Sequence, residues 1–109
     1  MSEVENAIEY RNLCCAVVHD AVHHATYTVD PEKTNAKHRA KAKREALQWL
    51  GSKRAQFWFD TLAIDQPRAL RAMGWVREVH ALLQLPEDIV YVSIAQREFF
   101  QEGLNSLQH

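Results

Sequence analysis

The sequence predicts an all-α protein, a single compact bundle of four to five helices. The 109 residues include only three glycines and three prolines, which are too few turns for a sandwich or barrel of many short strands. Apolar residues recur at helical spacing through most of the chain. Residues typical of helix starts and ends, such as Asp30 with Pro31 and then Gly51, divide the chain into segments of helical length.

The first helix is expected from Glu3 to about Tyr27 and the second from Pro31 to Leu50, with Gly51 as its C-terminal cap. A third is expected over Lys53 to Leu62. A fourth is expected from Gln66 to about Leu83, kinked or ended early by Gly74. One face of the first helix is apolar, which predicts that it is buried: Val4, Ala7, Ile8, Cys14, Cys15, Val18, Ala21, Val22 and Ala25.

The segment from residue 87 to 102 supports two interpretations. Val90, Val92 and Ile94 alternate with other residues as in a short strand, whereas Ile89 and Phe100 also fit a helical step. A lone strand has no pairing partner in this chain, so we predict a helix.

Composition predicts one domain over residues 1–109, with a core from about residue 3 to 102 and a frayed tail at 103–109. Most of that core is expected from the aromatic-rich stretch Glu45 to Gly74. The two cysteines are adjacent and cannot form an ordinary structural disulfide, which suits a reducing cytosol. No signal peptide or membrane-length apolar run is evident, so we expect a soluble protein in the cytoplasm of a bacterial host.

The near-neutral total charge conceals a basic middle: residues 31–54 hold eight Lys and Arg against two acids. Four of these cations follow one another at steps of four, four and three, and form a basic strip on the expected second helix: Lys33, Lys37, Lys41 and Arg44. Such a strip could neutralise nucleic-acid phosphates, although a solvated helix face is the commoner explanation.

Residues 56–73 fit a helix-turn-helix template. Trp58 and Leu62 would face inward, Ala63 would take the turn, and Ile64 would follow it. Asp65 would cap a second helix whose exposed arginines could reach a major groove: Arg68 and Arg71. The fit is imperfect, because Phe59 stands where the motif favours a small residue and Pro67 stiffens the second helix.

The consecutive aromatics at 57–59 cannot all point inward, because successive helical side chains are turned by about 100°. We therefore expect Phe57 or Trp58 to contact a partner or a second copy.

The chemistry-bearing patterns do not predict an enzyme. His19 and His23 stand in HDAVH, which resembles the zinc-binding H-E-x-x-H, but aspartate is shorter than glutamate and no third ligand is specified. Cys15 is one turn from His19, yet we expect it to be a core thiol. No metal or cofactor is predicted.

Three short motifs resemble small accessory proteins of bacteriophages and prophages: Ala16–Ala21 (AVVHDA), Ala46–Ser52 (ALQWLGS) and Leu62–Arg71 (LAIDQPRALR). The resemblance covers about residues 10–75. The family's usual Asp-Pro becomes Asp65, Gln66, Pro67 in this chain. Since the family has no established activity, the resemblance implies a phage or bacterial setting and no mechanism.

Two functional hypotheses follow. The first is a non-enzymatic phage-type protein that binds nucleic acid through the basic strip and the helix-turn-helix-like unit. The second is a protein-interaction module, such as a phage inhibitor of a host enzyme or defence complex. A homodimer is also expected, because a chain this small buries a limited fraction of its surface and carries surplus aromatics.

Overall fold

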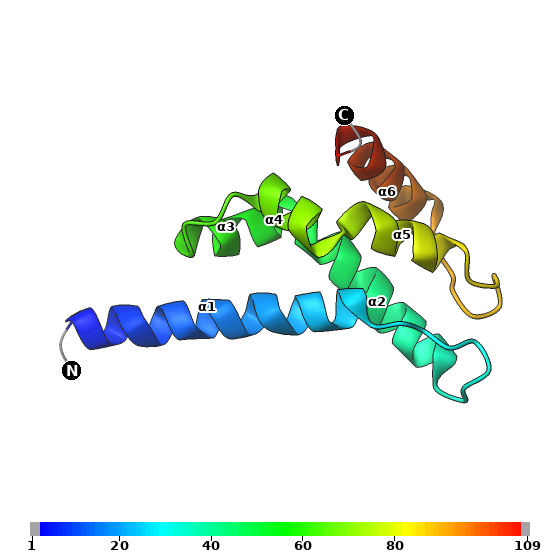
Figure 1. The fold of residues 1–109 in the computed structure, drawn as a ribbon, viewed down its shortest axis with the longest axis horizontal. Coiled ribbons are helices and arrows are strands. Elements are labelled where there is room, and N and C mark those ends of the chain that lie inside the picture. The colour runs from blue at the N-terminus through cyan, green and yellow to red at the C-terminus, as the bar shows by residue number, and fades with distance from the viewer. Residues whose placement is uncertain (1–2, 108–109) are drawn as a thin grey trace.

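The computed structural model describes residues 3–107, and this part of the chain is all-helical with no strand (Figure 1). It contains six helices: α1 (Glu3–Thr26), α2 (Ala36–Leu50), α3 (Lys53–Thr61), α4 (Gln66–Met73), α5 (Trp75–Leu83) and α6 (Ile94–Leu107). The predicted class is confirmed. The number of helices exceeds the predicted four to five, because Gly74 ends α4 and a new helix starts at Trp75. No described helix is long and apolar enough to cross a membrane.

α2 begins at Ala36, five residues later than predicted. The Asp30 side chain accepts a hydrogen bond from the backbone N–H of Glu32 at 3.0 Å, and its carbonyl accepts from the N–H of Lys33 at 3.1 Å. These bonds make a turn, because a short aspartate side chain competes with the helix for nearby N–H groups. The Asp30–Pro31 pair was therefore wrongly assigned to a helix start.

α3 and α4 begin where the sequence predicts. The Ser52 hydroxyl accepts a hydrogen bond from the N–H of Ala55 at 3.3 Å, and the Asp65 carboxylate accepts one from the N–H of Arg68 at 3.0 Å. Each bond satisfies a backbone donor that the first turn of a helix leaves without a partner. The two caps place α3 and α4 on either side of a four-residue turn, 62–65.

The segment predicted as a helix over 87–102 is helical only from Ile94 onward. Ser93 and Gln96 hydrogen-bond each other's backbone N–H at 3.3 and 3.2 Å, which is the reciprocal pattern of a capping box. Before this cap, residues 87–93 form neither the predicted helix nor a strand. Val90 and Val92 are buried in the core from this loop.

The C-terminal helix is longer than predicted. The sequence predicts fraying after Gly103, whereas α6 continues through Gly103 to Leu107, with Leu104 buried. Residues 108 and 109 of the expected tail lie outside the described residues. The extra turn forms because Gly103 allows α6 to approach Trp75 of α5 closely.

Trp75 belongs to a buried cluster that draws on all six described helices. Its indole N–H donates to the carbonyl of Leu47 at 2.9 Å, which satisfies its one polar atom. A Cβ added at Gly103 would lie 2.5 Å from the Trp75 ring, and one at Gly51 would lie 3.2 Å from it. The predicted core stretch, Glu45 to Gly74, therefore supplies only part of the core, since Trp75 and Phe100 lie outside it.

Lys43 joins three helices from inside the protein. Its side chain is only 3% exposed, and Nζ donates to the carbonyls of Ala25 at 2.8 Å and Tyr27 at 3.0 Å, and to Glu78 at 2.6 Å. The two carbonyls lie at the end of α1, where the helix dipole favours a positive charge. Lys43 of α2 thus holds the end of α1 against α5.

The N-terminal half of α1 extends away from the other helices (Figure 1). The predicted apolar face is buried only in its second part: Cys14 and Ala25 are buried, whereas Ala7, Ile8 and Cys15 are exposed. The core thiol is therefore Cys14 and the prediction for Cys15 was wrong. The cause is geometric, because α2 and the following helices cover α1 along part of its length only.

Candidate nucleic-acid interface

The predicted basic strip is shorter than expected. Lys37 and Lys41 are exposed on α2, but Lys33 lies in the turn before the helix. Arg44 is half-buried, and its guanidinium donates to the backbone carbonyl of Tyr91 in the loop before α6. Two lysines of the predicted four thus remain as an exposed pair on the helix itself.

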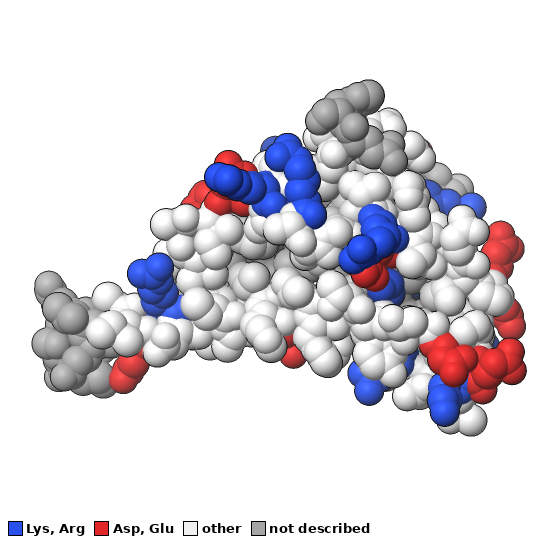
Figure 2. Space-filling view, viewed as in Figure 1, with Lys and Arg blue, Asp and Glu red and all other residues white. Residues whose placement is uncertain are grey.

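The charges on the face shown in Figure 2 form separate groups. Basic side chains are seen over α4, over the start of α5, and over the loop between α1 and α2. At the loop they stand beside acidic side chains, which agrees with the exposure of Asp30 and Glu32 there. Acidic side chains are also seen beside the basic ones over α4 and below those at the start of α5.

Gly74 creates a corner between α4 and α5. Its φ of +75° lies in the left-handed region, which glycine adopts without steric cost, and this ends α4 just before α5 begins at Trp75. The Arg77 guanidinium folds over this glycine, since a Cβ at Gly74 would lie 2.9 Å from Nη2 of Arg77. The corner thus brings an arginine of α5 back toward α4.

A shallow hollow of about 470 Å³ lies at this corner, lined by Arg71, Gly74, Trp75, Val76, Arg77 and His80. Its described lining includes two arginines and a histidine but no acid. Glu78 approaches Arg77 at 3.8 Å, but its other carboxylate oxygen accepts from Lys43 at 2.6 Å. Because Glu78 is shared between two cations, the local charge stays positive.

Arg68 extends the positive surface along α4. It is exposed three residues before Arg71, a spacing that places both side chains on neighbouring positions of one helix face. The opposite face of α4 carries the buried Leu70. We call the surface of Arg68, Arg71, Arg77 and His80 the α4–α5 corner.

Arg77 and His80 were missed in the sequence because the expected fourth helix was extended to about Leu83, with Gly74 left as either a kink or an early end. On one continuous helix, the 100° step per residue would fix the directions of Arg77 and His80 relative to Arg71. The signal that could have found them is Gly74 itself, read as a left-handed C-terminal cap followed by a second helix start.

The helix-turn-helix-like unit has some of its expected features. Leu62 is buried and Ala63 takes the turn with a φ of +56°, whereas Trp58 is only half-buried. Ile64, expected as the apolar residue of the turn, is exposed, and Phe59 fills the buried position of α3. The arrangement leaves Arg68 exposed in the first turn of α4.

The aromatic side chains of α3 divide as the 100° spacing predicts. Phe59 is buried, Trp58 is half-buried, and Phe57 is 57% exposed. Phe57 and Trp58 contact edge to face with ring centroids 5.9 Å apart, and Trp58 lies 6.4 Å from Trp49 of α2. The exposed aromatic surface is therefore on the side of α3 that meets α2.

The histidines of HDAVH lie on the surface of α1. His19 and His23 are exposed, and Asp20 is 3.7 Å from His24. Within residues that the structure describes, no group of three or more His, Cys, Asp or Glu side chains could hold a metal ion.

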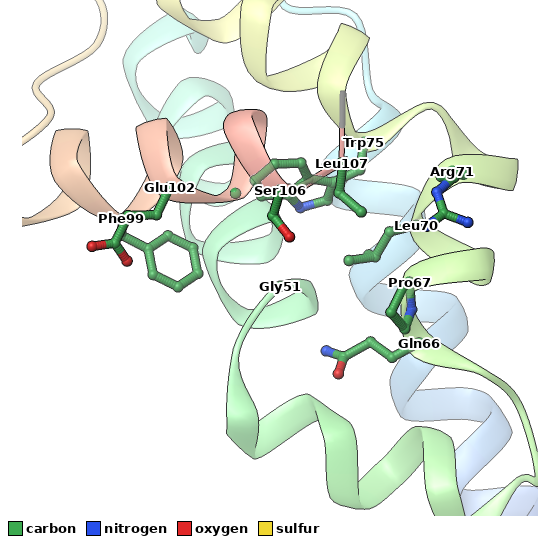
Figure 3. A pocket seen from close by; sticks show the side chains of 11 residues that line it. Gly51, Gln66, Pro67, Leu70, Arg71, Trp75, Phe99, Glu102, Ser106 and Leu107 are labelled. Carbon is green, nitrogen blue, oxygen red and sulfur yellow. The ribbon is translucent and has the colours of Figure 1, made fainter. Parts of the chain in front are cut away.

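A second hollow, of about 420 Å³, lies between α4 and α6 (Figure 3). Arg71 and Glu102 stand on opposite sides of it, and Trp75 and Phe99 contribute apolar wall. The Gln66 amide on its edge donates to the carbonyls of Leu50 at 2.8 Å and Ser52 at 3.0 Å. Gln66 thus joins the end of α2 to α4.

Comparison with protein-family models, curated proteins and solved structures finds no match for this chain.

Proposed function

We propose that this protein binds nucleic acid through the α4–α5 corner, as a non-enzymatic protein of a phage or bacterial setting. The observation that supports the proposal is the gathering of Arg71, Arg77 and His80 around one hollow whose described lining has no acid. Arg68 adds a fourth basic side chain beside them.

Arginine suits this task because its planar guanidinium can donate two parallel hydrogen bonds to a phosphate. Contacts of this kind bind the sugar-phosphate backbone and do not by themselves read sequence.

Lys37 and Lys41 of α2 supply a secondary attraction in this proposal. They are exposed and can act through long-range charge, whereas Lys33 has acids in the same loop and Arg44 is bonded to Tyr91. Charge reversal at the α4–α5 corner should therefore weaken binding more than charge reversal at the α2 lysines.

The test is fluorescence anisotropy with labelled duplex and single-stranded oligonucleotides, beginning at 50 mM salt. We expect binding that weakens steeply with added salt, and a loss of about tenfold or more in the Arg71→Glu/Arg77→Glu variant. Arg97→Glu is the control for Arg71→Glu and Arg77→Glu made singly, because Arg97 is exposed on α6 and each single substitution makes the same charge change.

Absence of binding to either oligonucleotide at 50 mM salt would refute the proposal. An equal loss in the Arg97→Glu variant would refute the assignment to the corner, since net charge alone would then explain it. Circular dichroism of each variant checks that the fold is retained.

The exposure of Phe57 beside Trp58 favours the second function, a protein-interaction module such as a phage inhibitor of a host enzyme. A pull-down from bacterial lysate would compare the wild type with Phe57→Ala and Trp58→Ala. Loss of one defined host protein in both variants, with retention in Arg71→Glu/Arg77→Glu, would support this function.

A further inference from the structure

The monomer has more surface than a compact chain of its size. Its accessible area is 7453 Å², about a fifth above the roughly 6,200 Å² expected for a folded 12.6 kDa monomer. Its radius of gyration, 15.4 Å, likewise exceeds the roughly 13 Å expected for this length. The excess area is somewhat larger than the roughly 800 Å² that one partner contributes to a standard interface.

Two of the exposed large apolar side chains lie on one flank of α1. Tyr10, Leu13 and Val17 follow one another at steps of three and four, so their side chains lie along the same side of the helix. Tyr10 and Leu13 are exposed, and the half of α1 that carries them extends past the other helices (Figure 1). Figure 2 shows few charges on the face of α1 turned toward the viewer.

The same flank continues into a groove between α1 and α2. The groove has a volume of about 340 Å³, and small or apolar side chains make up much of its lining: Val17, Ala21, Ala42, Ala46 and Trp49. Asp20, His24 and Glu45 also line it. Through the contacts of Trp49 with Trp58 and of Trp58 with Phe57, the apolar surface reaches α3.

We propose that a second copy of this chain covers this surface, with the two α1 helices packed antiparallel about a two-fold axis between Leu13 and Val17. One face of α1 carries the protruding side chains of Tyr10 and Leu13. One to two turns further along, the same face borders a groove walled by alanines. A two-fold axis places Tyr10 and Leu13 of each copy over the groove of the other, so the surface is complementary to itself.

The chemistry of the groove fits this occupant. Leu13 meets apolar walls, and the alanines allow the two helices to approach closely. In this register Tyr10 lies opposite Asp20 of the other copy, where the phenol can donate a hydrogen bond to a carboxylate. The apolar contact and the hydrogen bond are each made twice.

The decisive comparison is between Leu13→Glu and Ile8→Glu. Both residues are 55% exposed on α1, but they are five positions apart and so point about 140° from each other. In sedimentation velocity at about 100 µM, we expect the wild type and Ile8→Glu at twice the 12.6 kDa chain mass and Leu13→Glu at the chain mass. Circular dichroism should show all three folded, because neither side chain belongs to the core.

A cross-link tests the register. In a Cys15→Ser background, which removes the exposed native thiol, a mixture of Leu13→Cys and Val17→Cys chains should form the mixed disulfide in preference to either self-pair. The proposal is overturned if the wild type is monomeric at 100 µM, if Ile8→Glu dissociates it as strongly as Leu13→Glu, or if the mixed disulfide does not predominate.

This inference is independent of nucleic-acid binding. The monomeric Leu13→Glu variant keeps all four residues of the α4–α5 corner, so its contact with an oligonucleotide still depends on Arg71 and Arg77. A monomeric wild type that binds duplex would refute the dimer and support nucleic-acid binding. A dimeric wild type that does not bind would have the opposite meaning.

Discussion

Lys43 shows how one residue can decide the relation of three helices. Removing a lysine ammonium from water is costly unless its N–H groups find hydrogen-bond acceptors. The Lys43 ammonium donates to three acceptors. Two are carbonyls at the end of α1, which otherwise lack intrahelical partners. The third is Glu78 of α5, whose side chain is 15% exposed.

We expect Lys43→Met to lower the free energy of unfolding by about 2–4 kcal/mol, since it keeps the aliphatic stem but leaves two carbonyls and Glu78 without their donor. Urea denaturation followed by circular dichroism measures this change. Lys41→Met is the control, because Lys41 is exposed on the same helix and its loss should change stability by no more than about 0.5 kcal/mol. Equal effects of the two substitutions would contradict the role assigned to Lys43.

At the scale of elements, α5 and α6 are held together by close packing of one ring against a helix backbone. Trp75 is buried, contacts Phe100 at a centroid distance of 6.2 Å, and lies against Gly103 in the interior of α6. Glycine inside a helix ordinarily weakens it relative to alanine. Its presence here is explained by the space that the indole occupies.

Gly103→Ala should therefore destabilise the protein, although the same change in an exposed helix would stabilise it by about 1 kcal/mol. The added Cβ would lie 2.5 Å from the ring, so Trp75 or α6 must shift, and we expect a net loss of about 1–3 kcal/mol. Thermal unfolding measures the loss. Gly51→Ala, whose Cβ would lie 3.2 Å from the same ring, should cost less; the reverse order would contradict this account.

At the scale of the whole molecule, a single core serves a chain that is not uniformly compact. The principal extents are 51 × 35 × 22 Å, and the long dimension follows α1 (Figure 1). The inner half of α1 packs on the core through Ala25 and its neighbours, whereas its outer half has exposed side chains at Ile8, Tyr10 and Leu13. Helical hydrogen bonds alone give such a segment little stability in water.

Hydrogen exchange should reveal this division of α1. In the monomeric Leu13→Glu variant, amides of residues 7–13 should exchange at least about 100-fold faster than those of residues 18–25, because local opening there exposes little buried surface. If the wild type is the proposed dimer, the difference should shrink there, because the second copy would cover residues 10–17. Mass spectrometry of peptic peptides measures the exchange rates of the variant and of the wild type. Uniform protection along α1 of the variant would contradict the division of α1 into a packed and an unpacked half.

Local interactions explain what could be predicted from the sequence. The helical class, the length of α1 to within a residue, and the starts of α3 and α4 follow from apolar spacing and from the caps Ser52 and Asp65, all of which act within a few residues. The same reasoning failed at Asp30, where a local turn competed with a helix start, and at residues 87–93, which are held by burial of two valines.

Tertiary packing decided the rest, because it depends on where helices cross and not on any one helix. The α2 sequence places Lys43 among apolar positions, but only the end of α1 and Glu78 make its burial possible. Likewise Cys14 is covered while Cys15 is exposed, and Gly74 brings Arg77 beside Arg71. The sequence by itself determined the helical class and the helix starts that local caps set at Ser52 and Asp65. The three-dimensional contacts determined which charges are buried and which gather on the surface, since those contacts join residues far apart in the chain.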